Sequence, residues 1–251
     1  MRYRARVEYD GTDFAGFQAQ PGQRTVQGEL EAALARLSGG SRVRVVAAGR
    51  TDAGVHATGQ VIAFTYRGTL PARRLARALD ALLPDDVAIG ALRRVESSWH
   101  PRHAARYREY RYTVWNGPRS PLRERQALGV RERLDVAAMA EAAEHLVGRH
   151  DFSAYGGADR QPIRTLHRVR VRRQGRTVTI DVTGDAFLRQ MVRSIVAALL
   201  RVGRGEATAD DILAALRAPG RAFQGEVAPA KGLCLRQVRM GRPMRSRNGR
   251  T

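Results

Sequence analysis

The sequence predicts an α+β fold made of two similar halves. Roughly the first hundred residues alternate between strand and helix patterns in the order β, α, β, β, α, β, and the residues that follow repeat this order loosely. The chain has 251 residues, which is enough for one large domain or for two compact halves. Two such halves facing each other would leave one cleft between them, and we expect a functional site in that cleft.

The N-terminal half, which we place at residues 1–105, opens with a clear strand pattern. Residues 2–9 put tyrosine, alanine and valine on one face and mostly arginine on the other. Apolar residues then recur at helical spacing over 26–37, with Thr25 placed to cap the helix and glycines 39–40 to end it. The other elements expected in this half are strands at 42–48, 60–66 and 87–92 and a helix that Pro71 opens.

The C-terminal half, which we place at residues 106–238, begins after a charge-rich join at 96–110. Two of its strands are joined by the tight polar turn "RRQGRT". The elements expected here are strands at 107–115, 164–173, 176–183 and 232–238, helices at 135–147 and 209–217, and a helix containing Phe187, Met191, Ile195 and Leu199. Residues 239–251 hold arginines and no acid, and we expect them to form a disordered basic tail.

The charge of the chain points to a polyanionic partner. Its 44 lysine and arginine residues exceed its 24 aspartate and glutamate residues, for a net charge of +20. Such an excess favours nucleic acid through counterion release and long-range attraction. Only Lys231 is a lysine, and an arginine bias of this kind can also reflect genomic base composition. An anionic membrane is the weaker alternative, because no basic amphipathic helix with a bulky apolar face stands out.

Several classes of site have no support in the sequence. No signal peptide or membrane-spanning run is present, and the lone Cys234 cannot form an internal disulfide, so we expect a cytoplasmic protein. His100 and His103 have a ligand-like spacing, but Pro101 lies between them and no cysteine is near, so no metal site is expected. The phosphate-binding glycine motifs are missing, which predicts no nucleotide cofactor.

The strongest local signal is the loop around Asp52, in "AGRTDAGVHATGQ" at residues 48–60. A lone aspartate of this kind is usually a turn residue whose side chain bonds the backbone two residues on. Here the expected connection from Gly49 to Gly59 is much longer than a hairpin requires, and such loops are often functional. Arg50 and His56 lie nearby, and cations favour an ionised carboxylate that can act as nucleophile or base.

Four motifs together resemble the TruA family of tRNA pseudouridine synthases. They are "VEYDGTDFAGFQ", "AGRTDAGVHATGQ", "YREYRYTVWN" and "DAFLRQMVRSIVAALLRVG", which stand in the family's order over nearly the whole chain. The resemblance implies the pseudouridine synthase fold, with two α/β halves, a mostly antiparallel central sheet, helices on the outer faces and a catalytic cleft between the halves. It also implies isomerisation of uridine to pseudouridine in the anticodon stem-loop, at tRNA positions 38, 39 and 40, without a cofactor and by a homodimer.

The resemblance also assigns residues to roles. It gives the catalytic carboxylate to Asp52, a tyrosine that stacks on the target base and handles its C5 proton to Tyr110, and an arginine paired with the carboxylate to Arg193. Arg50 and His56 are expected to help bind the substrate. Whether Asp52 attacks the sugar carbon C1′ or removes a ribose proton is left open.

Taken without the resemblance, these residues have plainer interpretations. Tyr110 shares a strand face with Tyr112 and Val114 and is typical of core packing. Arg193 alone would be a surface charge, although its apolar neighbours favour a buried arginine with a carboxylate partner. Two other functions stay open: a non-catalytic RNA-binding protein on the same fold, and a hydrolase that uses Asp52 and His56 as acid and base.

Overall fold

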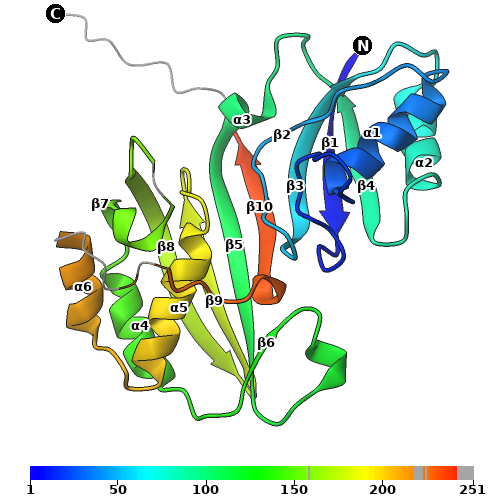
Figure 1. Ribbon diagram of the computed structural model, residues 1–251. Helices are drawn as coiled ribbons and strands as arrows, with labels where there is room; N and C mark the ends of the chain where they lie inside the picture. The colour runs from blue at the N-terminus through cyan, green and yellow to red at the C-terminus, as the bar shows by residue number, and fades with distance from the viewer. Residues whose placement is uncertain (158, 218–222, 224, 242–251) are drawn as a thin grey trace, which may run out of the picture.

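A single large sheet organises the protein in the computed structural model, which describes residues 1–157, 159–217, 223 and 225–241. Ten strands take the order β4-β1-β3-β10-β5-β9-β8-β7, with β2 beside β3 and β6 beside β5 (Figure 1). Among the strands of the described residues, only the β10–β3 and β5–β6 pairs are parallel. The mostly antiparallel sheet and the mixed α+β architecture agree with the prediction.

The N-terminal half contributes four strands and two long helices. In chain order they are β1 (Arg2–Tyr9), α1 (Val26–Leu37), β2 (Val46–Ala47), β3 (His56–Thr65), α2 (Ala72–Asp80) and β4 (Val87–Arg94). The expected cap of α1 is confirmed, because the Thr25 side chain accepts a hydrogen bond from the Gly28 amide. Residues 101–104 then form the short helix α3 (Pro101–Ala104), which leads into the second half.

The C-terminal half contributes the other six strands and three helices. In chain order they are β5 (Ala105–Asn116), β6 (Leu128–Val130), α4 (Val136–Glu144), β7 (Gly148–Asp151), β8 (Ile163–Gln174), β9 (Thr177–Gly184), α5 (Met191–Gly203), α6 (Ala209–Arg217) and β10 (Leu233–Met240). The described part of the chain also forms the 3-10 turns η1 (Pro121–Arg123), η2 (Ser153–Tyr155) and η3 (Ala230–Gly232).

Strand β10 joins the two halves into one sheet. It comes from the end of the chain but lies between β3 of the first half and β5 of the second (Figure 1). Its residues Cys234 and Leu235 pair with His56 and Ala57, and the next contacts run along β5. The halves therefore share a continuous backbone ladder.

One face of the sheet carries the core. A row of paired residues crosses it from strand to strand, and every member is buried: Tyr9, Ala57, Leu235, Tyr110, Val182 and Val169. The buried apolar residues of α1, α2, α4, α5 and α6 belong to the same core cluster as this row. The residues between them on β8, such as Arg168, Arg170 and Arg172, are exposed. This alternation is the pattern of an antiparallel sheet with one covered face and one open face.

Two predicted strands around the Asp52 loop have different limits in the structure. Residues 42–45 do not pair with a strand, because α1 side chains take the polar groups of Val45: its amide donates to Glu31 Oε1 and its carbonyl accepts from Gln27 Nε2. Strand β3 starts at His56 rather than at residue 60, because its first residues pair with β10. The loop therefore spans 48–55 and is shorter than predicted.

The structure differs from the prediction in three further places. Phe187 lies in the segment before α5 rather than on the helix. Strands β6 and β7 were not predicted, since neither has an alternating apolar pattern long enough to show in sequence. Arg239 and Met240, placed in the tail, extend β10 and pair with β5. Of the predicted tail, residues 242–251 lie outside the described residues.

Candidate active site

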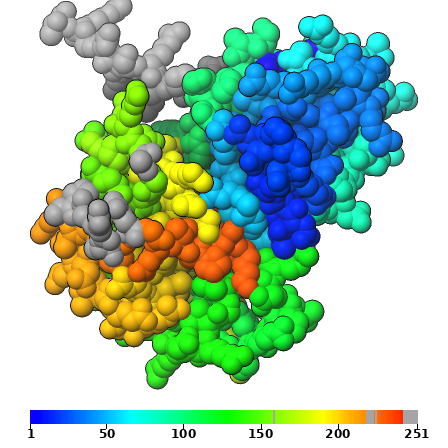
Figure 2. Space-filling model, viewed as in Figure 1, coloured from blue at the N-terminus to red at the C-terminus, as the bar shows by residue number. Residues whose placement is uncertain are grey.

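A cavity of about 1140 Å³ lies between the two halves, on the covered face of the sheet. The N-terminal half lines it with residues 15–18 and 48–53, and the C-terminal half lines it with residues of β5 and with 185–193. Figure 2 shows the two halves meeting on this side of the molecule, with the blue N-terminal segments facing the green to orange C-terminal ones. The cavity holds Asp52, Tyr110, Arg193 and Arg50.

The loop that carries Asp52 is held by hydrogen bonds from several elements. The Thr51 carbonyl accepts a hydrogen bond from the Phe17 amide at 3.1 Å, and the Thr51 hydroxyl lies 2.7 Å from the buried Tyr9 hydroxyl. Gln60, which is fully buried on β3, donates its side-chain amide to the Gly49 carbonyl at 3.0 Å. These contacts fix both the residue before Asp52 and the start of the loop, so the carboxylate is presented from a rigid support.

Two glycines let the segment 10–17 pack directly on this loop. A Cβ at Gly11 would lie 2.0 Å from the Val55 carbonyl oxygen, closer than any side chain tolerates. Gly16 has a φ of 99° and lies against Thr51 and Ala53. The motif "VEYDGTDFAGFQ" thus supplies the support of the Asp52 loop rather than reacting groups.

Asp52 pairs with Arg193, as the sequence predicted. Arg193 Nη1 lies 3.5 Å from Asp52 Oδ2, and the two side chains are 15% and 37% exposed. Arg193 is itself held in place, because its Nε donates to the Ala228 carbonyl at 2.7 Å. Within the described chain no backbone amide bonds the Asp52 carboxylate, so the structure does not support the alternative of a turn aspartate.

The turn before α5 brings Arg193 to the cavity. Gln190 precedes the helix with a φ of 61°, a left-handed conformation that is uncommon for a residue other than glycine. Residues 185–190 line the cavity up to this turn, and Arg193 lies in the first turn of the helix that follows. The apolar residues on the remaining faces of α5 are buried, which leaves its N-terminal end facing Asp52.

Tyr110 lies on β5 at the floor of the cavity and is 8% exposed. Phe187 packs edge-on against its ring, with the centroids 5.1 Å apart and the planes at 83°. Burial raises the pKa of Tyr110 to about 12, the nearby Arg108 lowers it and Asp52 raises it further. Tyr110 is therefore a core residue that also lines the cavity.

The structure places Arg50 and His56 differently. Arg50 is exposed and lines the cavity next to Asp52. His56 is buried behind the loop, where the Gly11 amide donates to its Nδ1 at 3.1 Å. Nδ1 also lies 3.1 Å from Asp10 Oδ1, and Nε2 lies 3.1 Å from the Lys231 carbonyl. Both nitrogens of His56 are thus engaged by the protein, outside the lining of the cavity.

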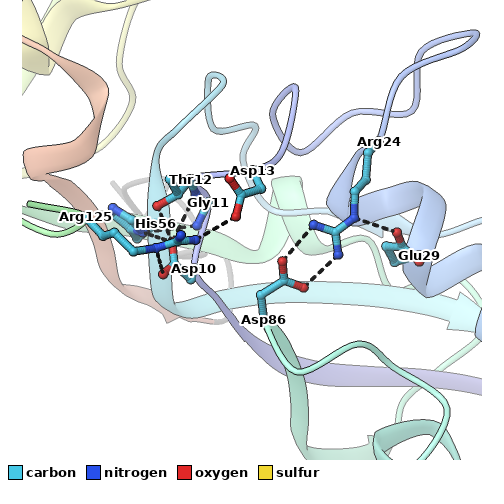
Figure 3. Close-up of polar contacts among 9 residues, drawn as sticks. All are labelled: Asp10, Gly11, Thr12, Asp13, Arg24, Glu29, His56, Asp86 and Arg125. Carbon is cyan, nitrogen blue, oxygen red and sulfur yellow. Dashed lines mark hydrogen bonds and ion pairs between the residues drawn. The ribbon is translucent and has the colours of Figure 1, made fainter.

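A polar cluster surrounds His56 and connects the halves (Figure 3). Asp10 Oδ1 accepts hydrogen bonds from the amide and hydroxyl of Thr12, which set the turn that approaches His56. Arg125, from the excursion between β5 and β6, reaches across to Asp10 at 3.2 Å and to Asp13 at 2.7 Å. These exposed ion pairs contribute little energy each, but they tie this excursion to the base of the Asp52 loop.

Sequence reasoning missed three residues that hold the site: Tyr9, Gln60 and Arg108. Each is a polar or charged group on the otherwise apolar face of its strand. Arg108 donates to the carbonyls of Asp185 and Ala48 at 2.6 and 2.7 Å. A polar side chain at a core-facing position must find partners in the protein, and this was the available signal.

The other candidates do not form a second site of this kind. His100 and His103 lie close, with ring centroids 4.6 Å apart, but across residues 1–157 and the later described segments no group of three potential ligands is placed to hold a metal ion. Cys234 is partly buried in β10, and burial raises the pKa of its thiol. No helix in the described parts of the chain is long and apolar enough to cross a membrane.

Comparison with known proteins gives consistent matches. A family model described as tRNA pseudouridine synthase matches residues 5–103 and 142–240. The tRNA pseudouridine synthase A of Shouchella clausii is 43% identical over 247 residues, which cover 97% of this chain and 95% of that protein. The protein of the same name from Geobacter sulfurreducens is 44% identical over 237 residues, covering 93% and 97%.

Proposed function

The chain belongs to the tRNA pseudouridine synthases, an isomerase family, and we propose that it converts uridine to pseudouridine at positions 38, 39 and 40 of the tRNA anticodon stem-loop. The reaction breaks the N1 glycosidic bond of uridine, turns the base and rejoins it through C5. Atoms and charge balance within the substrate, so no redox partner, phosphate donor or water is consumed. The net charge of +20 suits a polyanionic substrate of this kind.

Asp52 is the group that we assign to the sugar. The single observation that carries the proposal is the position of its carboxylate, on the wall of the cavity and 3.5 Å from the Arg193 guanidinium. The arginine neutralises the carboxylate, while among the described residues only one of the carboxylate oxygens is engaged. The other oxygen is free to meet the ribose, either at C1′ as a nucleophile or at a ribose proton as a base.

Tyr110 and Arg50 are assigned to the base and its surroundings. A uridine must leave its stack before a carboxylate can reach its sugar, and a freed base is held by stacking on an aromatic ring. Tyr110 offers that ring at the cavity floor, and we assign its hydroxyl to handling the proton on C5 of the base. Arg50, exposed beside Asp52, contributes a cation to the RNA. His56 was predicted to bind substrate, but both of its nitrogens hold the protein together, so we assign it to the support of the loop.

Replacement of Asp52 tests the proposal. Asp52→Asn and Asp52→Ala should bind an unmodified tRNA transcript nearly as well as the wild-type protein and yield no pseudouridine, as mapped base by base with carbodiimide. Asp86→Asn is the matched control, because it removes a carboxylate that pairs with Arg24 outside the cavity. Undiminished product from Asp52→Ala would end the assignment.

The same assay separates the alternatives. A non-catalytic RNA-binding protein would give no product with either the wild-type protein or the variants. A hydrolase using Asp52 and His56 would release a base or cleave the RNA, whereas isomerisation leaves the mass of the substrate unchanged. Mass spectrometry of the treated transcript distinguishes these outcomes, and the pattern of modified positions tests the assignment to 38, 39 and 40.

We also propose a homodimer in which each tRNA contacts both subunits, as the family resemblance implies. Sedimentation of the purified protein with and without tRNA tests this arrangement, and a monomer in both states would contradict it. The cytoplasmic location stays a prediction from sequence.

A further inference from the structure

Arg108 occupies an unusual position at the floor of the cavity. It lies on β5 two residues before Tyr110, on the same face of the strand. Its Nη1 donates to the Asp185 carbonyl at 2.6 Å, and its Nη2 donates to the Ala48 carbonyl at 2.7 Å. One guanidinium group thus connects two backbone segments that belong to opposite halves of the protein.

Those two carbonyls belong to the segments that carry the proposed reacting groups. Ala48 directly precedes the loop of Asp52. Asp185 begins the segment that holds Phe187 against Tyr110 and then turns into α5, where Arg193 lies in the first turn. The two hydrogen bonds therefore span the cavity from the base of one wall to the base of the other.

The charge of Arg108 is not explained by an ion pair. Across the described chain it has no carboxylate within ion-pair distance, and the Asp185 carboxylate accepts instead from the amides of Thr165 and Ala186. Burial lowers the pKa of Arg108, so the position disfavours the charge that it holds. A half-buried cation kept without a carboxylate partner in the described chain indicates that its geometry serves another purpose.

The planar fork of arginine is what the position uses. Nη1 and Nη2 are held in one plane and donate to two carbonyls at once, which the single ammonium group of lysine cannot reproduce. Gly49 of the loop lies beside the guanidinium, because a Cβ at that position would be in ordinary van der Waals contact with Arg108 Nε, at 3.4 Å. The side chain of Arg108 therefore lies directly against the start of the loop.

We propose that Arg108 is a positioning residue, which sets the separation between the Asp52 loop and the segment that carries Phe187 and Arg193. The proposal rests on the assignment of Asp52, Tyr110 and Arg193 to the reaction. Loss of the Arg108 guanidinium should let the two walls of the cavity shift relative to each other. A displacement near 1 Å at a reacting group costs about 100-fold in rate.

The variants Arg108→Lys and Arg108→Gln test the proposal with the full-length protein and an unmodified tRNA transcript. Both should lower kcat by about 10- to 100-fold and leave KM and tRNA affinity within about twofold. Arg111→Lys is the matched control: it breaks a two-pronged bond to Asp181, at 2.7 and 3.0 Å, three residues along the same strand and outside the cavity. The control should lower the melting temperature and leave kcat unchanged.

A double variant separates positioning from general stability. If Arg108 acts through the placement of Asp52 relative to Arg193, its effect should be coupled to that of Arg193. The double variant Arg108→Lys/Arg193→Lys should then lose less activation free energy for kcat than the two single variants lose in total. A wild-type kcat in Arg108→Lys would overturn the proposal. An Arg108 variant that is unfolded at the assay temperature and does not bind tRNA would also overturn it, because the role of Arg108 would then be in folding. If Asp52→Ala were active, the assignment of the reacting groups would fail, whatever Arg108 does.

Discussion

The pair of Arg193 and Asp52 makes the sharpest prediction about activity. Arg193→Ala removes the guanidinium that faces the carboxylate, and Arg193→Lys keeps the charge on a single ammonium group. In the structure Arg193 has two tasks, since Nη1 faces Asp52 and Nε holds the Ala228 carbonyl. Lysine can serve only one of them at a time, so it should be intermediate between arginine and alanine.

The size of the effect follows from the geometry. Unit charges 3.5 Å apart near a protein surface attract by about 5 kcal/mol at an effective dielectric constant near 20. Asp52 is 37% exposed, so water screens part of this attraction. Ion pairs contribute about 0.2–1 kcal/mol when exposed, and removing one partner of a buried pair costs about 3–5 kcal/mol, so this partly exposed pair should contribute about 1.5–3 kcal/mol. Since about 1.4 kcal/mol corresponds to a factor of ten in rate, Arg193→Ala should lower kcat by about 10- to 150-fold.

Single-turnover measurement isolates the chemical step. Excess enzyme is mixed with an unmodified tRNA transcript, and pseudouridine is quantified at each position over time, with tRNA affinity measured in parallel. We expect Arg193→Ala to be slower than Arg193→Lys, and both to be slower than the wild-type protein. Equal and near-wild-type rates for both variants would refute the assignment of Arg193 to Asp52.

Three further predictions concern stability and binding. Tyr9→Phe leaves the buried Thr51 hydroxyl without its 2.7 Å partner, so it should lower the free energy of unfolding by about 1–3 kcal/mol, measured by urea titration; no change would show that the bond adds nothing. Burial raises the pKa of Tyr110 from 10.0 to about 12, so its stabilising effect is complete below pH 10 and is lost as the pH rises toward 12. The stability difference between the wild-type protein and Tyr110→Phe should therefore shift by about 1.4 kcal/mol per pH unit in that window, and a constant difference would contradict the shift. Affinity for tRNA should fall by about 0.7–0.9 log unit per log unit of salt for each phosphate neutralised, whereas a flat response would argue against contacts with the RNA backbone.

The fold could be predicted where a pattern is local. Strand β1 shows strict alternation, and α1 has both its apolar spacing and its cap at Thr25, so both elements were placed correctly. The insertion of β10 between β3 and β5 could not be predicted, because strand order depends on contacts across nearly the whole chain. The same contacts moved the start of β3 to His56, where four residues of the expected loop join the sheet.

The residues of the candidate site also fall into those that could be predicted from the sequence and those that could not. Asp52, Tyr110 and Arg193 were located by resemblance, and the structure brings all three to one cavity. The residues that hold them were missed, although Arg108 shares the apolar face of β5 with Tyr110 and Tyr112 and was visible as an exception to the pattern. Its partners are backbone carbonyls of Ala48 and Asp185, and no sequence pattern shows which carbonyls a side chain will reach.

Two arginine–aspartate pairs in this protein show why Asp52 suits a reacting group. Arg111 holds Asp181 through both carboxylate oxygens, at 2.7 and 3.0 Å, and the aspartate side chain is 5% exposed. Both oxygens of that buried carboxylate are held by Arg111, so the pair acts within the structure. Asp52 instead meets Arg193 at one oxygen and at 3.5 Å, with its side chain 37% exposed to the cavity. The longer, one-sided contact neutralises the charge and leaves an oxygen for a substrate, whereas a two-pronged pair like that of Asp181 would have closed the carboxylate to any ribose.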